Sequence, residues 1–306
     1  MTVSPRTRPL LTVLGLTGLL LLTGCGESHP GGATATLPPL GAVPVVTDPQ
    51  QITFPTDPYV LTVAQLRQLD RAQNAVTVRC MKGFGFTSKG VTAVGLDQEA
   101  AVRLSRNPVF GVFNPAQVAA KGYDYFVAIP PADPAGGPVP SAEEQTALNG
   151  TDATGRPVDS VNGMPLPPGG CAKKGRDAVG GKAPVIADSA LPDGGPRTPP
   201  SDPRIADAYA KWAACMHGKG YTYPDPTAAV SDPRWKKDAT GASPQQIATA
   251  GADVQCKIEN NTVGVIVAVE SAYGRLYIDS HGSALTAYRQ RLDETLAKAA
   301  GLVAQG

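Results

Sequence analysis

The chain has 306 residues, 42% of them hydrophobic and 17% charged, with 34 glycines, 30 prolines and a formal net charge of +1. Two of its 27 basic residues, Arg6 and Arg8, lie among the first 24 residues, so the remainder carries 25 basic against 26 acidic side chains. This neutral balance argues against nucleic-acid binding and against a polybasic membrane-binding patch, and the glycine and proline content indicates long irregular segments.

The first 25 residues have the pattern of a bacterial export signal. Arg6 and Arg8 precede an uncharged apolar run from Leu10 to Leu22, which is too short to span a bilayer comfortably. The run ends in Leu22-Thr23-Gly24-Cys25, which resembles a lipobox. We therefore expect a signal peptide over residues 1–24 and a diacylglycerol on Cys25, which anchors the exported protein to the outer face of the cell membrane. An ordinary secretory signal is the alternative.

Residues 25–56 are rich in proline, glycine and threonine and nearly free of charge. This composition predicts a disordered tether between the lipid anchor and the folded body.

Two seven-residue boxes of related sequence follow, one from Cys80 to Phe86 and the other from Cys215 to Tyr221. Both read C-M-x-G-x-G-aromatic, and each closes a segment with helical spacing. The glycines arrive where a left-handed C-terminal cap is expected. The repeat predicts two related helical units, over residues 57–181 and 182–306, the second including a linker.

Helix start signals precede both boxes. In the first unit Thr62 and Gln65 form a capping-box pair, and in the second Asp202 and Pro203 give an N-cap followed by proline at the first helical position. Apolar residues then recur at helical spacing, and they are Leu66, Leu69, Ala72, Val76 and Cys80 in the first unit and Ile205, Tyr209, Trp212 and Met216 in the second.

The segments between these helices are less regular. Asn114-Pro115 predicts a helix that ends at Gly122. Residues 130–168 are expected to be largely irregular, with one short helix from Ser141 to Ala147, and residues 180–203 form the predicted linker.

The C-terminal part is the most regular. Ser243, Pro244 and Gln246 start one helix, and a single long helix is predicted from about Thr262 to Val303, with bends at Gly274 and Gly282. Its apolar face comprises Ile266, Val269, Tyr273, Leu276, Tyr277, Leu285, Tyr288, Leu292, Leu296 and Ala299. Because this face follows a 3.6-residue period, we favour a helix packed on the core over a coiled-coil partner helix.

Four cysteines remain once Cys25 is set aside, and four permit three disulfide connectivities. We prefer Cys80 with Cys171 and Cys215 with Cys256, because each pair then closes one unit. A zinc site that uses the cysteines and His217 is the weaker alternative, since the spacing is not that of a zinc finger. No C-x-x-C redox pair occurs. The sequence predicts no metal and no cofactor.

No catalytic signature is present. Asp279-Ser280-His281 contains the residue types of a catalytic triad, but adjacent helix positions point about 100° apart, so no relay is expected there. His217 is interpreted as a surface or capping histidine. The aromatic residues Tyr123, Tyr125, Phe126, Tyr221, Tyr223 and Trp235 are suited to line a ligand groove, although we favour packing.

The lipobox, the two boxes, the PPGGC before Cys171 and the ADVQCK that contains Cys256 together resemble a family of uncharacterised secreted lipoproteins of actinobacteria. The resemblance covers most of the exported chain and implies export, lipidation and a helical, disulfide-bonded body. It implies no catalytic residue.

These observations predict a mainly α fold of two disulfide-closed helical units with long irregular loops. The favoured function is a non-enzymatic binding or adaptor protein of the cell envelope, whose partner is another envelope protein or a cell-wall component. The alternative is an envelope hydrolase whose catalytic carboxylates the sequence does not single out.

Overall fold

The computed structural model describes residues 37–87, 113–123, 140–181, 188–235 and 241–305. Within these ranges the protein is mainly α-helical, as predicted. Residues 38–306 form one compact unit, and every contact discussed below lies in it. The predicted signal peptide, Cys25, Tyr125 and Phe126 lie outside the described residues.

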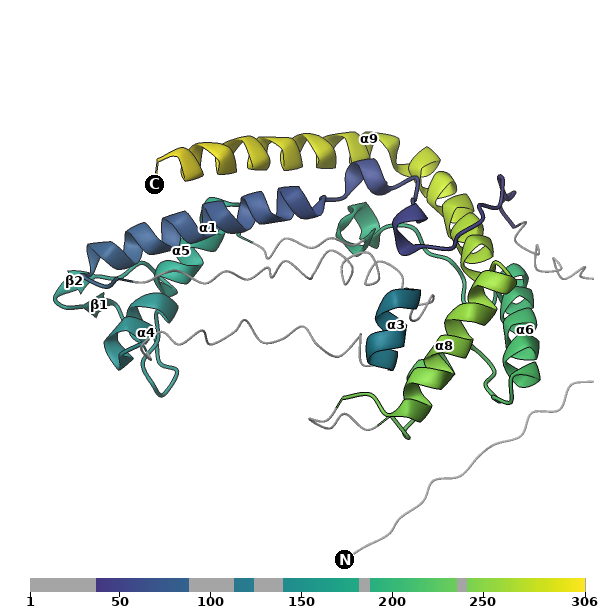
Figure 1. Cartoon of the computed structure of the whole chain (residues 1–306). Helices are drawn as coiled ribbons and strands as arrows, with labels where there is room; N and C mark the ends of the chain where they lie inside the picture. Colours follow the sequence, from purple (N-terminus) through teal and green to yellow (C-terminus); the bar gives the residue numbers. More distant parts are fainter. Residues whose placement is uncertain (1–36, 88–112, 124–139, 182–187, 236–240, 306) are drawn as a thin grey trace, which may run out of the picture. The chain divides into compact units, whose positions relative to one another are not determined.

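Figure 1 shows the helices and the β1–β2 hairpin, coloured by their order along the chain. The α-helices are α1 (Val63–Gly83), α3 (Pro115–Lys121), α4 (Ala142–Asn149), α5 (Gly170–Ala178), α6 (Pro203–Gly218), α7 (Pro226–Val230), α8 (Pro244–Glu259) and α9 (Thr262–Ala304). Short 3-10 turns are η1 (Pro49–Gln51), η2 (Asp57–Tyr59), η5 (Asp188–Ala190) and η6 (Pro192–Gly194), and the strands are β1 (Ser160–Val161) and β2 (Met164–Pro165).

The helix starts that the sequence predicts are confirmed. In α1 the Thr62 hydroxyl accepts from the backbone N–H of Gln65 at 3.2 Å, and the Gln65 side chain accepts from the backbone N–H of Thr62 at 2.9 Å. The side chains of Asn114, Ser141, Asp202 and Ser243 also accept from backbone N–H groups in the first turns of α3, α4, α6 and α8, without the reciprocal bond. These side chains satisfy backbone donors that have no partner within the helix.

The two boxes form the same turn. Phe86 N–H donates to the carbonyl of Met81 at 3.1 Å, and Tyr221 N–H donates to the carbonyl of Met216 at 2.9 Å. The glycine before each aromatic residue has a left-handed backbone, with φ of 85° at Gly85 and 87° at Gly220. A residue with a Cβ would be strained there, which explains the glycine in both copies.

Both predicted disulfides are present, and each joins two helices. Cys80 of α1 is bonded to Cys171 of α5, and Cys215 of α6 is bonded to Cys256 of α8. Helix α9 packs against α1, which precedes residue 181, and against α6 and α8, which follow it. The boundary between two repeat units at residue 181 therefore stays a prediction.

Helix α9 packs on the core along its length, as expected (Figure 1). Val263 and Ile266, near its start, pack with Ile205 of α6, whereas Leu296 and Ala299, near its end, pack with Leu69 of α1 and other residues of its apolar face. Leu276 was expected on the buried face but is 56% exposed. None of the described helices is long and apolar enough to cross a membrane.

The bend in α9 lies at His281, where φ is −122° and ψ is 15°, one residue before the predicted Gly282. The Ser280 hydroxyl donates to the carbonyls of Leu276 and Tyr277, both at 3.0 Å. Side chains that bond to helix carbonyls in this way compete with the backbone ladder and bend a helix.

The prediction of a disordered tether over residues 25–56 is wrong for residues 38–56. Val46 is fully buried, and Asn261 bonds this segment to the start of α9. The Asn261 side chain donates to the carbonyl of Pro44 at 2.8 Å and accepts from the N–H of Val46 at 3.1 Å. A Cβ on Gly264 would lie 2.0 Å from the Pro44 carbonyl oxygen. The segment therefore folds because Asn261 forms hydrogen bonds with its backbone and Gly264 leaves space for the Pro44 carbonyl.

Two other irregular segments are also more ordered than expected. Within residues 130–168, α4 is the short helix that was predicted, and the described part also contains a hairpin closed by Asn162-Gly163, whose φ angles of 53° and 72° suit a two-residue turn. Within the predicted linker, Leu191 is buried and the carbonyl of Pro192 accepts from the Tyr277 hydroxyl at 2.7 Å.

Candidate functional site

A cavity of about 550 Å³ lies among η5, α6, α7, α9 and the segment before η2. Its lining residues are Phe54, Pro55, Thr56, Asp188, Pro196, Thr198, Pro199, Pro200, Ile205, Tyr209, Thr227, Glu270 and Gly274. The walls combine proline rings and aromatic faces with a small number of polar groups. This size and composition are those of a small-molecule site.

Helices supply one side of the cavity. Ile205 and Tyr209 lie one turn apart on α6, and Glu270 and Gly274 lie one turn apart on α9, so each pair presents one helix face. Tyr209 is half-buried, and burial raises the pKa of its phenol, with the negative charges of Asp225 and Glu270 adding to the shift. The phenol is therefore neutral over the physiological range.

Another part of the lining comes from two segments without long helices. Thr56 is only 1% exposed, and its hydroxyl donates to the carboxylate of Asp188 at 3.1 Å. Upstream, the backbone N–H of Phe54 donates to the carboxylate of Asp57 at 2.9 Å. The bond from Thr56 joins this segment to η5, and the bond from Phe54 closes the local turn before η2. Pro55 also faces α9, since a Cβ on Gly274 would lie 3.7 Å from its ring.

The charged side chains that line the cavity are both acidic. They are Asp188 and Glu270, each half-buried, and no lysine, arginine or histidine lies among the described lining residues. Arg204, which is close in sequence to Ile205, is instead paired with Asp202, with the guanidinium Nη2 and the carboxylate oxygen 2.7 Å apart.

That Asp202 carboxylate is fully buried and accepts several hydrogen bonds. The guanidinium of Arg204 is the main donor, the backbone N–H of Arg204 adds a second bond at 3.0 Å, and the hydroxyl of Tyr273 adds a third at 3.1 Å. Together these donors lower the pKa of Asp202, with the bond from the Arg204 side chain contributing most. The group ties the start of α6 to α9.

A second group of ionisable residues lies entirely inside the protein. Lys257 and Asp253, one turn apart on α8, are both 0% exposed, and the Lys257 Nζ donates to the Asp253 carboxylate at 2.9 Å. The same carboxylate accepts from the Trp212 indole at 3.0 Å and from the Tyr123 hydroxyl at 3.3 Å. Burial raises the pKa of Asp253 and lowers that of Lys257. None of these residues lines the cavity, and we interpret the network as structural.

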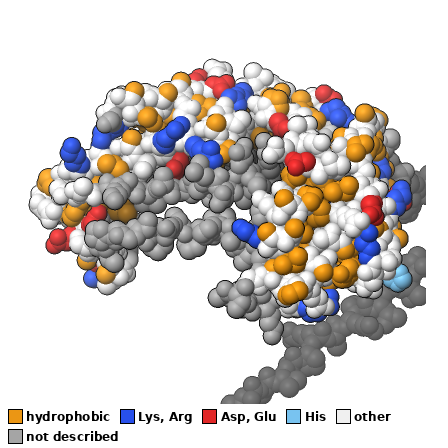
Figure 2. Space-filling model, in the orientation of Figure 1, with side chains coloured by type: hydrophobic (Ala, Val, Ile, Leu, Met, Phe, Trp, Pro, Cys, Tyr) orange, Lys and Arg blue, Asp and Glu red, His pale blue; other side chains and the backbone are white. Residues whose placement is uncertain are grey.

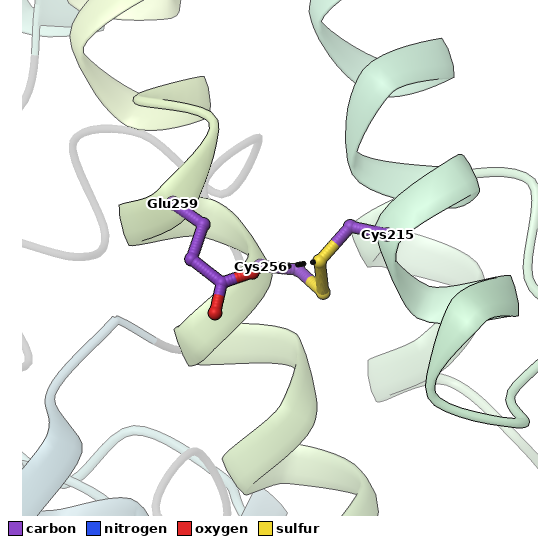
Figure 3. A group of neighbouring side chains, drawn as sticks. All are labelled: Cys215, Cys256 and Glu259. Carbon is purple, nitrogen blue, oxygen red and sulfur yellow. Dashed lines mark hydrogen bonds between the residues drawn. A yellow bond between two sulfur atoms is a disulfide. The ribbon is translucent and has the colours of Figure 1, made fainter.

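Three potential metal ligands meet at the second disulfide, as Figure 3 shows. The carboxylate Oε2 of Glu259 lies 3.3 Å from the Sγ of Cys215, and the Sγ of Cys215 is bonded to that of Cys256. Bridged sulfurs carry no proton to donate and are not thiolate ligands. The other oxygen of Glu259 accepts from Gln255 at 2.7 Å and from Lys219 at 3.4 Å. These residues therefore form a disulfide next to the ion pair of Lys219 and Glu259, and not a set of metal ligands.

The interpretation of Asp279-Ser280-His281 was wrong in its geometry. The Ser280 hydroxyl lies 2.8 Å from the Nδ1 of His281, because the backbone leaves helical geometry at His281. The Nε2 of His281 lies 3.4 Å from the carboxylate of Asp193. However, the Ser280 hydroxyl is engaged by two helix carbonyls, and neither Ser280 nor His281 lines the cavity. The arrangement therefore forms the bend of α9 and provides no nucleophile directed into a cleft.

The remaining residues that the sequence singled out lie outside the cavity. His217 is exposed in the last turn of α6. Tyr123 and Trp235 have ring centroids 5.8 Å apart, and Tyr221 and Tyr223 pack on the same cluster. The packing interpretation of the aromatic residues is thus confirmed for those that the structure describes.

Figure 2 shows hydrophobic side chains gathered over α3 and α8. They border a shallow groove whose lining includes Val118, Ile247, Val254 and Ile258. Nothing in the structure shows what covers this groove, so we assign it no ligand.

No sequence pattern marks the cavity. Tyr209 was identified only as a core residue of its helix, Phe54 and Thr56 fell in the expected tether, and Asp188 fell in the expected linker. No motif or spacing marks Glu270 either. No family model, curated protein or solved structure matches the chain.

Proposed function

We propose that the protein is a non-enzymatic binding protein of the cell envelope, whose ligand occupies the cavity between α6 and α9. The observation that carries the proposal is the cavity itself, with a volume of about 550 Å³, walls of proline, aromatic and aliphatic side chains and a few polar groups. Such a composition suits a small organic molecule or the end of a cell-wall component. We favour the cavity over α9 as the binding element, because most of the predicted apolar face of α9 is covered by the core.

The proposed location is the outer face of the cytoplasmic membrane, with the lipid carried by Cys25. The lipobox that ends at Cys25 and the resemblance to secreted actinobacterial lipoproteins support this location. The two disulfides agree with it, since such bonds persist in oxidising compartments outside the cytoplasm.

Metabolic labelling tests the lipid anchor. Bacteria that express the full chain are fed an alkyne fatty acid and then fractionated. We expect wild type and the control Thr23→Ser to be labelled and to sediment with membranes, and Cys25→Ser to be unlabelled. Labelling of Cys25→Ser equal to that of wild type would show that the anchor is elsewhere.

Ligand capture tests the cavity. Thr227 lines the cavity but is exposed, so it lies at the rim, where a larger side chain would block entry with little effect on the core. The protein is purified from membranes without denaturation, and the small molecules that it releases on unfolding are identified by mass spectrometry. We expect a species that co-purifies with wild type and with Thr227→Ser but not with Thr227→Trp. Identical release from all three proteins would refute binding in the cavity.

The hydrolase alternative is favoured by one observation. Two carboxylates, those of Asp188 and Glu270, line the same cavity. A pair of carboxylates can act as general acid and base. The discriminating assay incubates purified protein with isolated cell walls and measures released fragments. Release that Asp188→Asn and Glu270→Gln each abolish would establish the hydrolase, and no release above a buffer control favours the binding protein.

A further inference from the structure

We propose that residues 38–46, here called the entry segment, form a membrane contact that lies on the lipid surface beside the acyl chains of Cys25. The proposal rests on the lipid anchor of the proposed function. It adds the face of the folded body that the anchor holds against the bilayer.

The entry segment has no polar side chain, and its large side chains alternate between inside and outside. Its sequence is PPLGAVPVV. Val46 is fully buried, and Leu40 packs on the same core cluster. On the other side, Val43 is 43% exposed, Val45 is 75% exposed and Pro39 is exposed as well. This alternation is typical of an extended chain, and it leaves an outward apolar stripe. Val45 is the most exposed large hydrophobic side chain among the described residues.

Hydrogen bonds hold both ends of the entry segment. At one end, the carbonyl of Pro38 accepts from the guanidinium of Arg204 at 2.7 Å. At the other end, Asn261 bonds to the carbonyl of Pro44 and to the N–H of Val46. Figure 1 shows the segment in dark purple beside α9. Because the inward side chains are packed in the core, the outward stripe cannot turn inward to leave water.

The short connection to Cys25 makes the bilayer the favoured partner of this stripe. Only residues 26–37 lie between Cys25 and the entry segment. An extended chain spans at most ~3.6 Å per residue, so Pro38 lies no farther than about 45 Å from Cys25, which is about the thickness of one bilayer. The stripe therefore meets lipid at a high effective concentration, and a contact too weak to bind a free protein is sufficient.

The neighbouring groups suit the boundary between lipid headgroups and acyl chains. Arg275 is exposed, and a Cβ on Gly41 would lie 3.4 Å from its guanidinium Nη2, so a cation lies beside the entry segment. A guanidinium matches the geometry of a phosphate group. Thr47 and Asp48 end the apolar run, so the contact is shallow. The valine and proline side chains of the stripe enter this boundary because burial removes their apolar surface from water.

Quenching by brominated lipid tests the contact. The Val45→Cys protein is purified with its lipid, labelled with bimane on the introduced cysteine, and placed in vesicles of equal amounts of phosphatidylcholine and phosphatidylglycerol. We expect at least twofold lower emission when the acyl chains of the phosphatidylcholine are brominated. Glu143→Cys, at an exposed position on α4, is the control and should be unquenched. Val43→Cys provides a second label position if Val45→Cys fails to fold.

Two substitutions separate the effect of the stripe from that of the tether. In the protein labelled at Val45→Cys, Val43→Asp adds a charge to the stripe and should reduce the quenching to less than half. Met164→Asp changes an exposed apolar residue of β2 and should leave the quenching unchanged. Both variants keep the same lipid and the same tether, so a difference between them reports on the stripe.

Absence of quenching at both label positions would overturn the inference. Iodide then identifies the reason, because a label that iodide reaches faces water, whereas a label that it does not reach is covered by a second copy of the chain. Full quenching in Val43→Asp would also overturn the inference, since the tether alone would then explain the proximity.

Metabolic labelling of Cys25 keeps this inference distinct from the lipid anchor. Lipid on Cys25 without quenching of the bimane would remove only the membrane contact. A Cys25 without lipid would remove the anchor and the contact with it.

Discussion

The buried pair of Asp253 and Lys257 gives the sharpest prediction about the stability of the protein. Asp253→Leu removes the carboxylate that accepts from Lys257, Trp212 and Tyr123, and it leaves the ammonium group of Lys257 in a site that is 0% exposed. Removing one partner of a buried ion pair costs about 3–5 kcal/mol of folding free energy. Since a whole domain is stable by only about 5–15 kcal/mol, this variant should unfold far more readily.

The double variant Asp253→Leu with Lys257→Met separates the cost of a stranded charge from the cost of lost contacts. Burial raises the pKa of the acid and lowers that of the base, so the protein interior disfavours both charged forms. Removing both charges should therefore recover at least about 2 kcal/mol relative to Asp253→Leu alone, because two hydrophobic side chains suit the site better than a buried ammonium group that has lost its carboxylate.

Urea unfolding followed by circular dichroism, at pH 7 and with both disulfides intact, measures these differences. Asp207→Leu is the matched control, because Asp207 forms an exposed pair with Lys211, and we expect a change within about 0.5 kcal/mol. A double variant that is no more stable than Asp253→Leu alone would refute the interpretation of a coupled pair.

Three further predictions concern the cap of α6, the second disulfide and a tight turn. Asp202→Asn keeps the helix cap but loses the ion pair, so it should cost about 1–2 kcal/mol at pH 7. Because the folded-state pKa is lowered, wild type loses this advantage as pH falls below the ordinary value of 3.8, and the two unfolding curves should converge in acid; a constant gap would contradict the assignment. Replacing Cys215 and Cys256 by alanine should cost about 2–5 kcal/mol in calorimetry, and an unchanged melting temperature would disprove a stabilising role. Gly150→Ala, whose Cβ would lie 2.4 Å from the backbone of α5, should destabilise more than Gly155→Ala, whose Cβ meets open space; equal urea midpoints would refute the steric argument.

The residue pattern alone is enough to predict most of the helices and to favour the observed pairing of the cysteines among three. Capping side chains such as Thr62 and Ser243 act within three residues, and the turn at Gly85 and Gly220 depends on a backbone angle that glycine tolerates, so these signals can be read locally. The disulfides could be predicted because only four cysteines remain and each preferred pair closes one predicted unit.

Four features could not be predicted from the sequence and depend on tertiary packing. They are the folding of residues 38–56, the bend at His281, the buried Asp253–Lys257 pair and the cavity. Asn261 binds a segment more than 200 residues earlier in the chain. The composition of that segment by itself predicts a tether, because it does not show this distant partner. The cavity walls come from segments around residues 54, 188, 198, 209, 227 and 270, which have no fixed spacing in sequence. Local patterns specify helices because their partners are three or four residues apart, whereas a binding site depends on packing between distant segments, which no local pattern encodes.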